Sequence, residues 1–200
     1  SAANAGRLPV QLRYQSGHTS ETYVTEEAWR SASLPGCPLH PKGGCDFARH
    51  GSYARVDPPG TRIARWYCPQ GHRTFSLLPD HLAARFPGTL GEIEAVVAEV
   101  ECARSMEAAA NALRPDDVTL ATALRWIRRR LRLVHAVLRI VVSLLPDLCL
   151  GSAPTVCSVR ARLACEPVLT ALRHFAHRHL QVLPRPLGFF HRCGDPGGRK

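Results

Sequence analysis

Lysine is almost missing from this chain, since Lys42 and Lys200 are its only two and arginine supplies nearly all of the positive charge. Lys and Arg together number 26 against 16 Asp and Glu, which gives a formal net charge of +10. Such an excess favours an anionic partner, and nucleic acid is the first expectation. A genome rich in G and C also raises arginine along with alanine and proline, so the arginine bias by itself leaves that alternative open.

The sequence also lacks a signal-peptide pattern and a long uninterrupted apolar run. Its N-terminus has no charged start followed by a short apolar stretch, as secretory signals have. The most apolar segment, residues 131–150, is interrupted by Arg132, Arg139 and Pro146, within the roughly 20 residues that a membrane span needs. We therefore expect a buried helix there, no membrane partner, and a cytoplasmic, nucleoid-associated protein.

A disulfide scaffold is not expected either, because such scaffolds are normally short and secreted. Five of the eight cysteines are scattered among helical patterns, where we expect them to be small core residues, with the last an exposed thiol: Cys102, Cys149, Cys157, Cys165 and Cys193.

Residues 1–35 predict a lead-in of one strand and one short helix. Apolar side chains alternate at Val10, Leu12 and Tyr14, which favours a strand. Thr25 precedes EEAWRSA, where the N-cap of a helix is expected. Residues 36–80 then predict short strands, because GSYARV and TRIARWYC flank DPPG, a sequence suited to a tight turn.

Residues 88–150 predict a helical domain with three successive segments, TLGEIEAVVAEVECA, SMEAAANAL and VTLATALRWIRRRLRLVHAVLRIVVSLL. Residues 151–192 predict a further helical segment, in which Pro167 stands near a first helical turn. Residues 193–200 predict a flexible tail.

Five metal-ligand side chains bracket the predicted hairpin. CPLHPKGGC supplies Cys37, His40 and Cys45, and CPQGH supplies Cys68 and His72. Zinc takes four such ligands in a tetrahedron, and short loops at the end of a hairpin deliver them from two sides. Two kinds of set fit the spacing. In the first, each loop gives two ligands, which are Cys37 with either Cys45 or His40 from the first loop and Cys68 with His72 from the second. In the second, the ligands are Cys37, His40, Cys45 and Cys68. A closed structural Zn²⁺ site is expected, in which the metal substitutes for a core.

These residues resemble the N-terminal zinc ribbon of insertion-element transposases and of a bacterial family of unknown function found with them. Knuckles in such ribbons read Cys-Pro-x-Cys followed by Gly-x-Thr-Phe, and this chain has CPLH and CPQGHRTF, with a histidine in place of one cysteine and a second loop one residue longer. The resemblance covers about residues 37–80 and implies a zinc-ribbon module.

The long helical pattern from Val118 to Leu145 has an apolar seam and a separate arginine face. No acidic residue occurs between Val118 and Pro146, which makes an ordinary solvated charged face less expected than a surface for an anion. The seam falls at spacings of three and four, at Leu120, Leu124, Ile127, Leu131, Val134, Leu138, Val141 and Leu145, and the cationic face carries Arg125, Arg128, Arg129, Arg132 and Arg139.

The start of this pattern, VTLATALRWIRR, resembles the recognition helix of transposase helix-turn-helix domains. The resemblance implies that Val118, Ala123 and Trp126 face the core and that SMEAAANAL, with Ala109 or Ala110 at the crossing point, forms the preceding helix. The RPDD turn is longer than usual and lacks a glycine. The residues implied to face the major groove are Thr119, Leu120, Ala121, Arg125 and Arg128.

The fold class expected from all of this is α+β, with a small zinc-ribbon β-hairpin module followed by an α-helical domain that contains a helix-turn-helix. The transposases in question cut DNA with three carboxylates on an RNase H-like domain, and residues after Leu145 contain only Asp147, Glu166 and Asp195 as acids. We therefore expect a non-catalytic protein that binds double-stranded DNA, with a transposase or integrase as a further partner. A metal-dependent nuclease or recombinase component, and an adaptor that forms homo-oligomers through the seam, are the alternatives.

Overall fold

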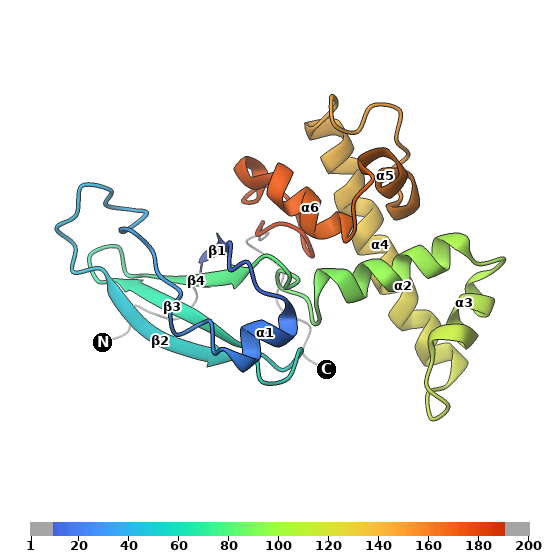
Figure 1. Ribbon diagram of the computed structural model, residues 1–200, viewed down its shortest axis with the longest axis horizontal. Helices are drawn as coiled ribbons and strands as arrows, with labels where there is room; N and C mark the ends of the chain where they lie inside the picture. The colour runs from blue at the N-terminus through green and yellow to red at the C-terminus, as the bar shows by residue number, and fades with distance from the viewer. Residues whose placement is uncertain (1–9, 191–200) are drawn as a thin grey trace. The chain divides into compact units, whose positions relative to one another are not determined.

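The computed structural model describes residues 10–190 and has an α+β fold, with a four-stranded mixed sheet followed by helices (Figure 1). This confirms the coarse part of the predicted fold class. Contacts divide the chain into two compact units, Ser1–Thr89 and Leu90–Lys200. The predicted tail 193–200, with Cys193, lies outside the described residues.

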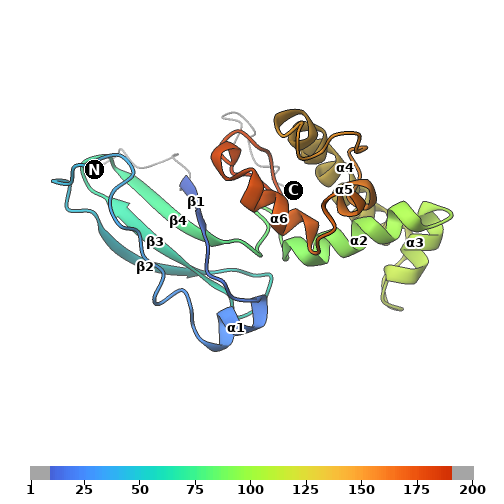
Figure 2. The ribbon, with the colours of Figure 1, turned by 45° about the horizontal axis from the view of Figure 1, so that its top comes forward.

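The sheet has the strand order β1-β4-β3-β2, and three of its strands lie within the predicted ribbon segment, residues 36–80. β2 (Ala48–Ala54) and β3 (Arg62–Cys68) pair antiparallel around the DPPG turn, as predicted, and β4 (Arg73–Pro79) pairs antiparallel with β3. β1 (Val10–Tyr14) lies parallel to β4, with Val10 opposite Phe75 (Figure 2). The predicted lead-in strand therefore exists, and it belongs to the same sheet as the hairpin.

The predicted helix in the lead-in was misplaced. Helix α1 spans Ser20–Thr25, and its N-cap is Thr19, whose side chain accepts a hydrogen bond from Thr22 N while the Thr22 side chain accepts one from Thr19 N. This capping box satisfies the backbone N–H groups of Thr19 and Thr22 at the start of the helix. The chain leaves the helix through Glu27 at a φ of 49°, so EEAWRSA forms turns instead of the expected helix.

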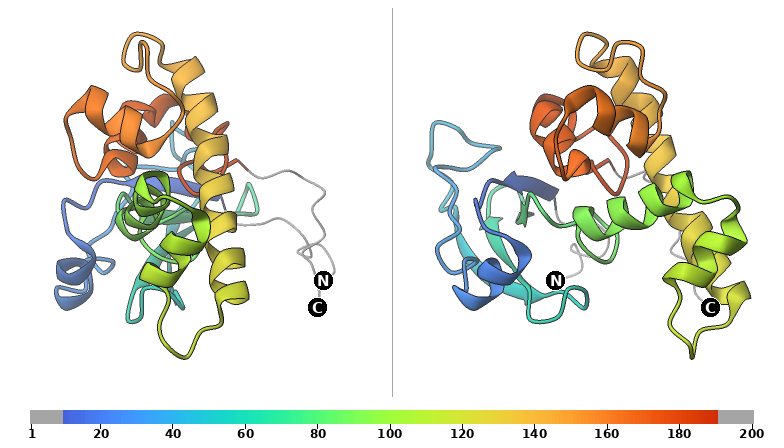
Figure 3. Two further views of the ribbon diagram at one scale, coloured as in Figure 1. Left: turned by 90° about the vertical axis from the view of Figure 1, so that its right-hand side faces the viewer. Right: turned by 45° about the vertical axis from the view of Figure 1, so that its right-hand side comes forward.

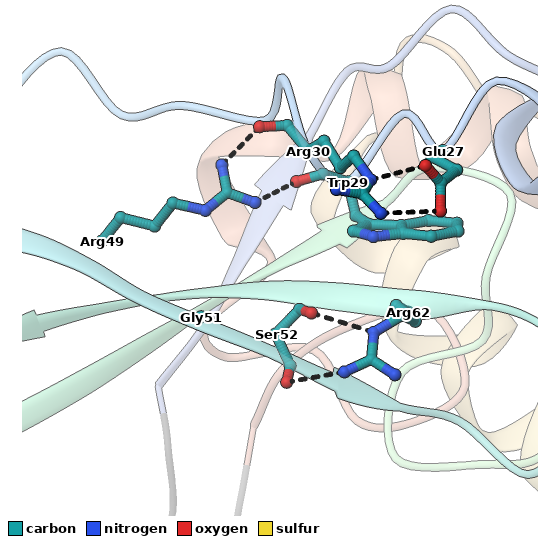
Figure 4. A pocket seen from close by; sticks show the side chains of 7 residues that line it. All are labelled: Glu27, Trp29, Arg30, Arg49, Gly51, Ser52 and Arg62. Carbon is teal, nitrogen blue, oxygen red and sulfur yellow. Dashed lines mark hydrogen bonds and ion pairs between the residues drawn. The ribbon is translucent and has the colours of Figure 1, made fainter.

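Arg49 of the edge strand β2 holds this turn region, and Arg62 of β3 binds β2 beside it. The Arg49 guanidinium donates to the carbonyl oxygens of Trp29 and Arg30, at 2.6 and 2.5 Å, and Arg62 donates to Ser52 Oγ at 3.0 Å (Figure 4). The strand bulges between Arg49 and Ser52. These side chains line a polar hollow, but they use their donors to hold the backbone of the same unit.

The second unit contains six helical segments within the described residues. Three correspond to predicted segments, α2 (Leu90–Cys102), α3 (Met106–Leu113) and α4 (Leu120–Leu144), and α6 (Val168–Phe175) follows Pro167 as expected. A short 3₁₀ turn, His177–His179, comes next. Helix α5 (Val156–Leu163) lies within the predicted helical segment 151–192, but it was not singled out as a separate helix, although its N-cap Thr155 is a sequence signal that could have located it.

Helix α2 packs against α3, α4, α5 and α6 (Figure 3). Two of its glutamates bind the starts of neighbouring helices. The buried Glu94 carboxylate accepts from the backbone N–H groups of Val168 and Leu169, at 2.9 and 2.8 Å, at the start of α6. Two helical turns further along α2, Glu101 accepts hydrogen bonds from Val156 N and Cys157 N at the start of α5. Carboxylates in these positions satisfy helix N-terminal donors and oppose the positive end of each helix dipole.

Helix α4 fully buries half of its predicted seam and partly buries the rest. Ile127, Val134, Leu138 and Val141 are fully buried, and Leu120, Leu124, Leu131 and Leu145 are half-buried. The expectation that Trp126 faces the core was wrong. Its side chain is 39% exposed and lies under Arg130, whose guanidinium carbon is 3.9 Å from the ring centroid. Position 126 is about 100° around the helix from Ile127, which puts it at the margin of the buried face.

Candidate metal centre

Four of the five predicted ligands converge at one end of the sheet. Cys37, His40 and Cys45 come from the loop before β2, and Cys68 is the last residue of β3; their ligand atoms all lie within 4.8 Å of one another. His40 Nδ1 is 3.6 Å from Cys37 Sγ and 3.3 Å from Cys68 Sγ. The three cysteines are buried and the histidine is half-buried. This grouping is the three-plus-one set of the two that the spacing allowed.

The fifth candidate, His72, is outside this group. It is exposed in the turn between β3 and β4 at a φ of 46°, and its Nδ1 lies 3.5 Å from the Tyr67 hydroxyl. Its neighbours in CPQGH instead support the site, because Gly71 N donates to Cys68 Sγ at 3.2 Å and Gln70 Nε2 donates to the Gly44 carbonyl at 2.7 Å. Gln70 was not among the residues that the sequence analysis singled out, and it ties the two ligand loops together.

The first loop is folded tightly by its own backbone. His40 N donates to the Cys37 carbonyl at 3.2 Å, and Gly43 N donates to the His40 carbonyl at 2.9 Å. Gly43 and Gly44 then take φ values of 82° and 81°, a region that side chains disfavour. These turns bring the chain back on itself so that Cys45 returns to the side of the loop that carries Cys37.

Beneath the ligands the core of this part of the sheet is small. The three cysteines form one buried cluster with Phe75, against which Phe47 and Trp66 pack as a stacked pair with ring centroids 5.3 Å apart. A cluster of this size would hold two loops weakly by apolar contact alone. Cross-linking by a metal is the usual supplement in a segment so small.

The electrostatics of the three sulfurs suit a bound cation. Burial raises the pKa of Cys37, but hydrogen bonds from His40 and from the backbone amides of Leu39 and His40 outweigh it and lower that pKa to about 6. Burial, together with its neighbours Cys37 and Cys68, raises the pKa of Cys45 to about 11. The sulfurs therefore resist being charged together without a positive ion, and a divalent cation removes that conflict because it binds thiolates.

The donor set passes the chemical test for a metal ion. Three sulfurs and one imidazole nitrogen are soft or borderline ligands, and four of them form a closed tetrahedral set. Cys37, His40, Cys45 and Cys68 would hold the ion, and the chemistry it would supply is cross-linking of the loop before β2 to the end of β3.

The residues predicted to contact DNA lie at the start and along one side of α4. Thr119 is the N-cap, with its hydroxyl accepting from Thr122 N at 3.3 Å, and Ala121 is exposed while Leu120 is half-buried. The exposed arginines Arg125, Arg128, Arg129 and Arg132 line one shallow hollow of about 490 Å³. Arg139 is exposed two turns further along.

Three arginines on the cationic face of α4 are not neutralised by acidic side chains. Across residues 10–190, Arg125, Arg128 and Arg132 form no ion pair. Two acids of this unit bind other partners, since the buried Glu94 binds Arg160 at 2.8 Å and the half-buried Glu101 binds His135 Nε2 at 2.8 Å. The charges of Arg125, Arg128 and Arg132 therefore remain available to a partner.

Helix α3 supports the beginning of α4 from beneath. Ala109 and Ala110 are fully buried, and Ala110 forms one cluster with Ala123 and Ile127 of α4. Arg114 Nη1 donates to the Val118 carbonyl at 2.8 Å and so closes the connection between the two helices. Small residues at this contact suit close packing of α3 against α4, and the crossing point at Ala109 or Ala110 stays a prediction.

Comparison with protein-family models, curated proteins and solved structures finds no match to this chain. Within residues 10–190, no helix combines the length and the apolar character that crossing a membrane requires.

Proposed function

We propose that this protein is a non-catalytic, zinc-stabilised DNA-binding protein related to the targeting region of transposases, and that it binds double-stranded DNA through α4. The observation that carries the proposal is the row of exposed arginines on α4, four of which line one hollow on a helix without a single acidic residue. Arginine suits this role because its planar fork makes paired hydrogen bonds to phosphate and to guanine.

Zinc is the metal proposed for the Cys37, His40, Cys45 and Cys68 set. The ligand types support it, because thiolate and imidazole donors in a closed set of four are typical of structural zinc. A closed set leaves no position for water or substrate, and this favours a stabilising role over the alternative of a metal-dependent nuclease or recombinase.

The proposed reading of DNA divides the arginine face into two parts. Arg125 and Arg128, in the first turns of α4, are proposed to contact base edges together with Thr119, Leu120 and Ala121, while Arg129, Arg132 and Arg139 are proposed to contact phosphates. Contacts of the first kind discriminate between sequences, and those of the second kind supply affinity that depends on salt. The proposed setting is a mobile element, with a transposase or integrase as partner and the nucleoid as the location.

An adaptor that binds protein is the second candidate, and one observation favours it. An apolar hollow of about 330 Å³ lies between α3 and α4, lined by Leu113, Val118, Ala123, Trp126 and Ile127 among others. Binding of the full chain to labelled duplex, competed by unlabelled duplex over a salt series, separates the two. A DNA-binding protein is displaced by competitor and weakened by salt, whereas an adaptor shows no duplex binding to displace.

A further inference from the structure

Two cysteines outside the metal centre lie in contact, although they are far apart in the sequence. Cys102 is the last residue of α2, and Cys157 is the second residue of α5. Both are free thiols with their sulfur atoms 3.6 Å apart. Cys102 is exposed and Cys157 is partly exposed, so small molecules in solution reach this pair.

The two thiols differ in their surroundings. Burial, followed by the neighbouring Glu101 carboxylate, raises the pKa of Cys157 to about 12. Glu101 itself is held by Cys157 N and by His135 Nε2, each at 2.8 Å. Cys157 is therefore a protonated thiol in a fixed position, while Cys102 projects from a helix end into solvent. The exposed sulfur is the one that meets an oxidant first.

We propose that Cys102 and Cys157 form a reversible disulfide when the protein meets hydrogen peroxide. The Cys102 sulfur attacks one peroxide oxygen, the O–O bond breaks, and sulfenic acid and water form. The Cys157 sulfur then attacks the Cys102 sulfur, the S–O bond breaks as the S–S bond forms, and the departing hydroxide leaves as water with the proton of Cys157. Two thiols are oxidised, one peroxide is reduced, and two molecules of water are released.

The geometry favours a disulfide over a second metal site. Among the described residues, the only group whose ligand atoms converge as a metal requires is the one around Cys68. Glu101, the nearest carboxylate to Cys157, is committed to the N-terminus of α5. A disulfide needs a sulfur separation of about 2.05 Å. Cys102 is the last residue of α2, and helix ends fray, so this side of the pair can supply the remaining approach.

The bond would connect α2 to α5 at the point where Glu101 already joins them. It would close a loop containing α3 and α4 and so restrict the unfolded chain. The oxidised second unit is therefore expected to unfold at a higher temperature than the reduced one.

The test treats the full chain, as purified with its metal, with hydrogen peroxide and then digests it without reductant. Mass spectrometry of the wild type should find a peptide pair joined through Cys102 and Cys157, lighter by two hydrogens and separated again by dithiothreitol. Cys157→Ser should leave Cys102 as a sulfenic acid that dimedone traps. Cys102→Ser should leave Cys157 reduced, and Cys165→Ser should still form the pair.

Two results would overturn the proposal. One is a wild-type digest in excess peroxide that lacks the joined Cys102 and Cys157 peptides, or in which Cys102 is joined equally to Cys149 or Cys165. The other concerns the stabilising effect of the disulfide. If the helical signal of the reduced and of the cross-linked wild type has the same thermal midpoint, the proposal is contradicted. Zinc content, measured in parallel, shows whether the metal centre is intact in each sample.

Discussion

The Sγ of Cys68 lies 3.3 Å from Nδ1 of His40, although the two residues are 28 positions apart in the sequence. The β2–β3 hairpin makes this contact, since it leaves the first ligand loop, turns at DPPG and returns Cys68 to the same end of the sheet. A metal ion at this point would fix the two ends of the hairpin and the loop before it.

The two histidines next to the site should differ in their effect on metal binding. His40→Ala removes a proposed ligand and should weaken zinc binding by more than about tenfold, because loss of even an outer partner of a ligand typically costs about 10- to 100-fold. His72→Ala is the matched control and should bind zinc like the wild type. Competition with a chromophoric chelator measures both. Equal weakening by the two variants would contradict the Cys37, His40, Cys45 and Cys68 set.

Losing a cysteine ligand should unfold one unit and spare the other. Cys37→Ser should release the metal and unfold the sheet of residues 10–79, while the helices of residues 90–175 remain, because the second unit has its own core. Cys165→Ser, outside the site, should keep one zinc per chain. Elemental analysis gives the metal content, and circular dichroism follows the helices. If the wild type, purified without chelator, contains no zinc, this prediction is wrong.

The expected pattern of helices and strands came from local signals. The DPPG turn and the apolar period of α4 are local, and each element appeared where the pattern indicated. Thr19 was missed because its cap depends on a reciprocal bond with Thr22, and either threonine alone is an ordinary polar residue.

The candidate site could also be predicted only in part. Spacing identified five ligands but could not choose between His40 and His72, because the choice depends on where the loop before β2 folds back. Trp126 was expected inside by resemblance, yet it lies at the edge of the buried face, where Arg130 covers it. The role of Glu101 could not be foreseen, because its partners, His135 and the start of α5, follow 34 and 55 positions later.

A methyl group at Gly188 should destabilise the second unit. A Cβ there would lie 2.1 Å from the Leu183 carbonyl oxygen, and backbone cannot rotate away as a side-chain end can. Gly188→Ala should lower the free energy of unfolding by about 1–3 kcal/mol, the usual range for overpacking. Gly91→Ala is the control, since a Cβ at Gly91 meets nothing within 4 Å and alanine favours helix. Urea unfolding followed by helical circular dichroism compares them, and equal effects would contradict the prediction.

The contribution of Glu101 to stability should depend on acid. Burial acts to raise the pKa of Glu101, but hydrogen bonds from Cys157, His135 and Val156 hold it below the ordinary value of 4.5. The folded state therefore binds fewer protons than the unfolded state near that pH. The contribution of Glu101 to the free energy of unfolding is complete above pH 4.5, and it is lost as the pH falls through the lower pKa of the folded state.

Glu101→Gln should accordingly be less stable than the wild type by about 1.5–3 kcal/mol at neutral pH, the usual worth of hydrogen bonds to a charged group. The difference should shrink as the pH falls below 4.5 and through the lower pKa of the folded state, because the carboxyl becomes protonated. Glu99→Gln, on the exposed side of the same helix, should show no such trend. The measurement is unfolding of the helical signal across this pH range. A difference between wild type and Glu101→Gln that is constant with pH would refute the assignment.

The most direct test of the proposed function is a salt-titrated binding series of the full chain on random and selected duplexes, measured by fluorescence anisotropy. The wild type should bind both at low salt. Arg125→Ala should lose about 1–3 kcal/mol on its preferred site and relax sequence choice. Arg132→Ala and Arg139→Ala should weaken all duplexes alike and make the slope of log affinity against log salt shallower by about one unit each.

Arg178→Ala removes the same charge from an exposed position outside α4 and should keep the wild-type affinity and slope in that series. DNA binding through α4 predicts this separation between the α4 variants and Arg178→Ala. Absence of wild-type binding to any duplex at low salt, or α4 variants that bind like Arg178→Ala, would contradict it.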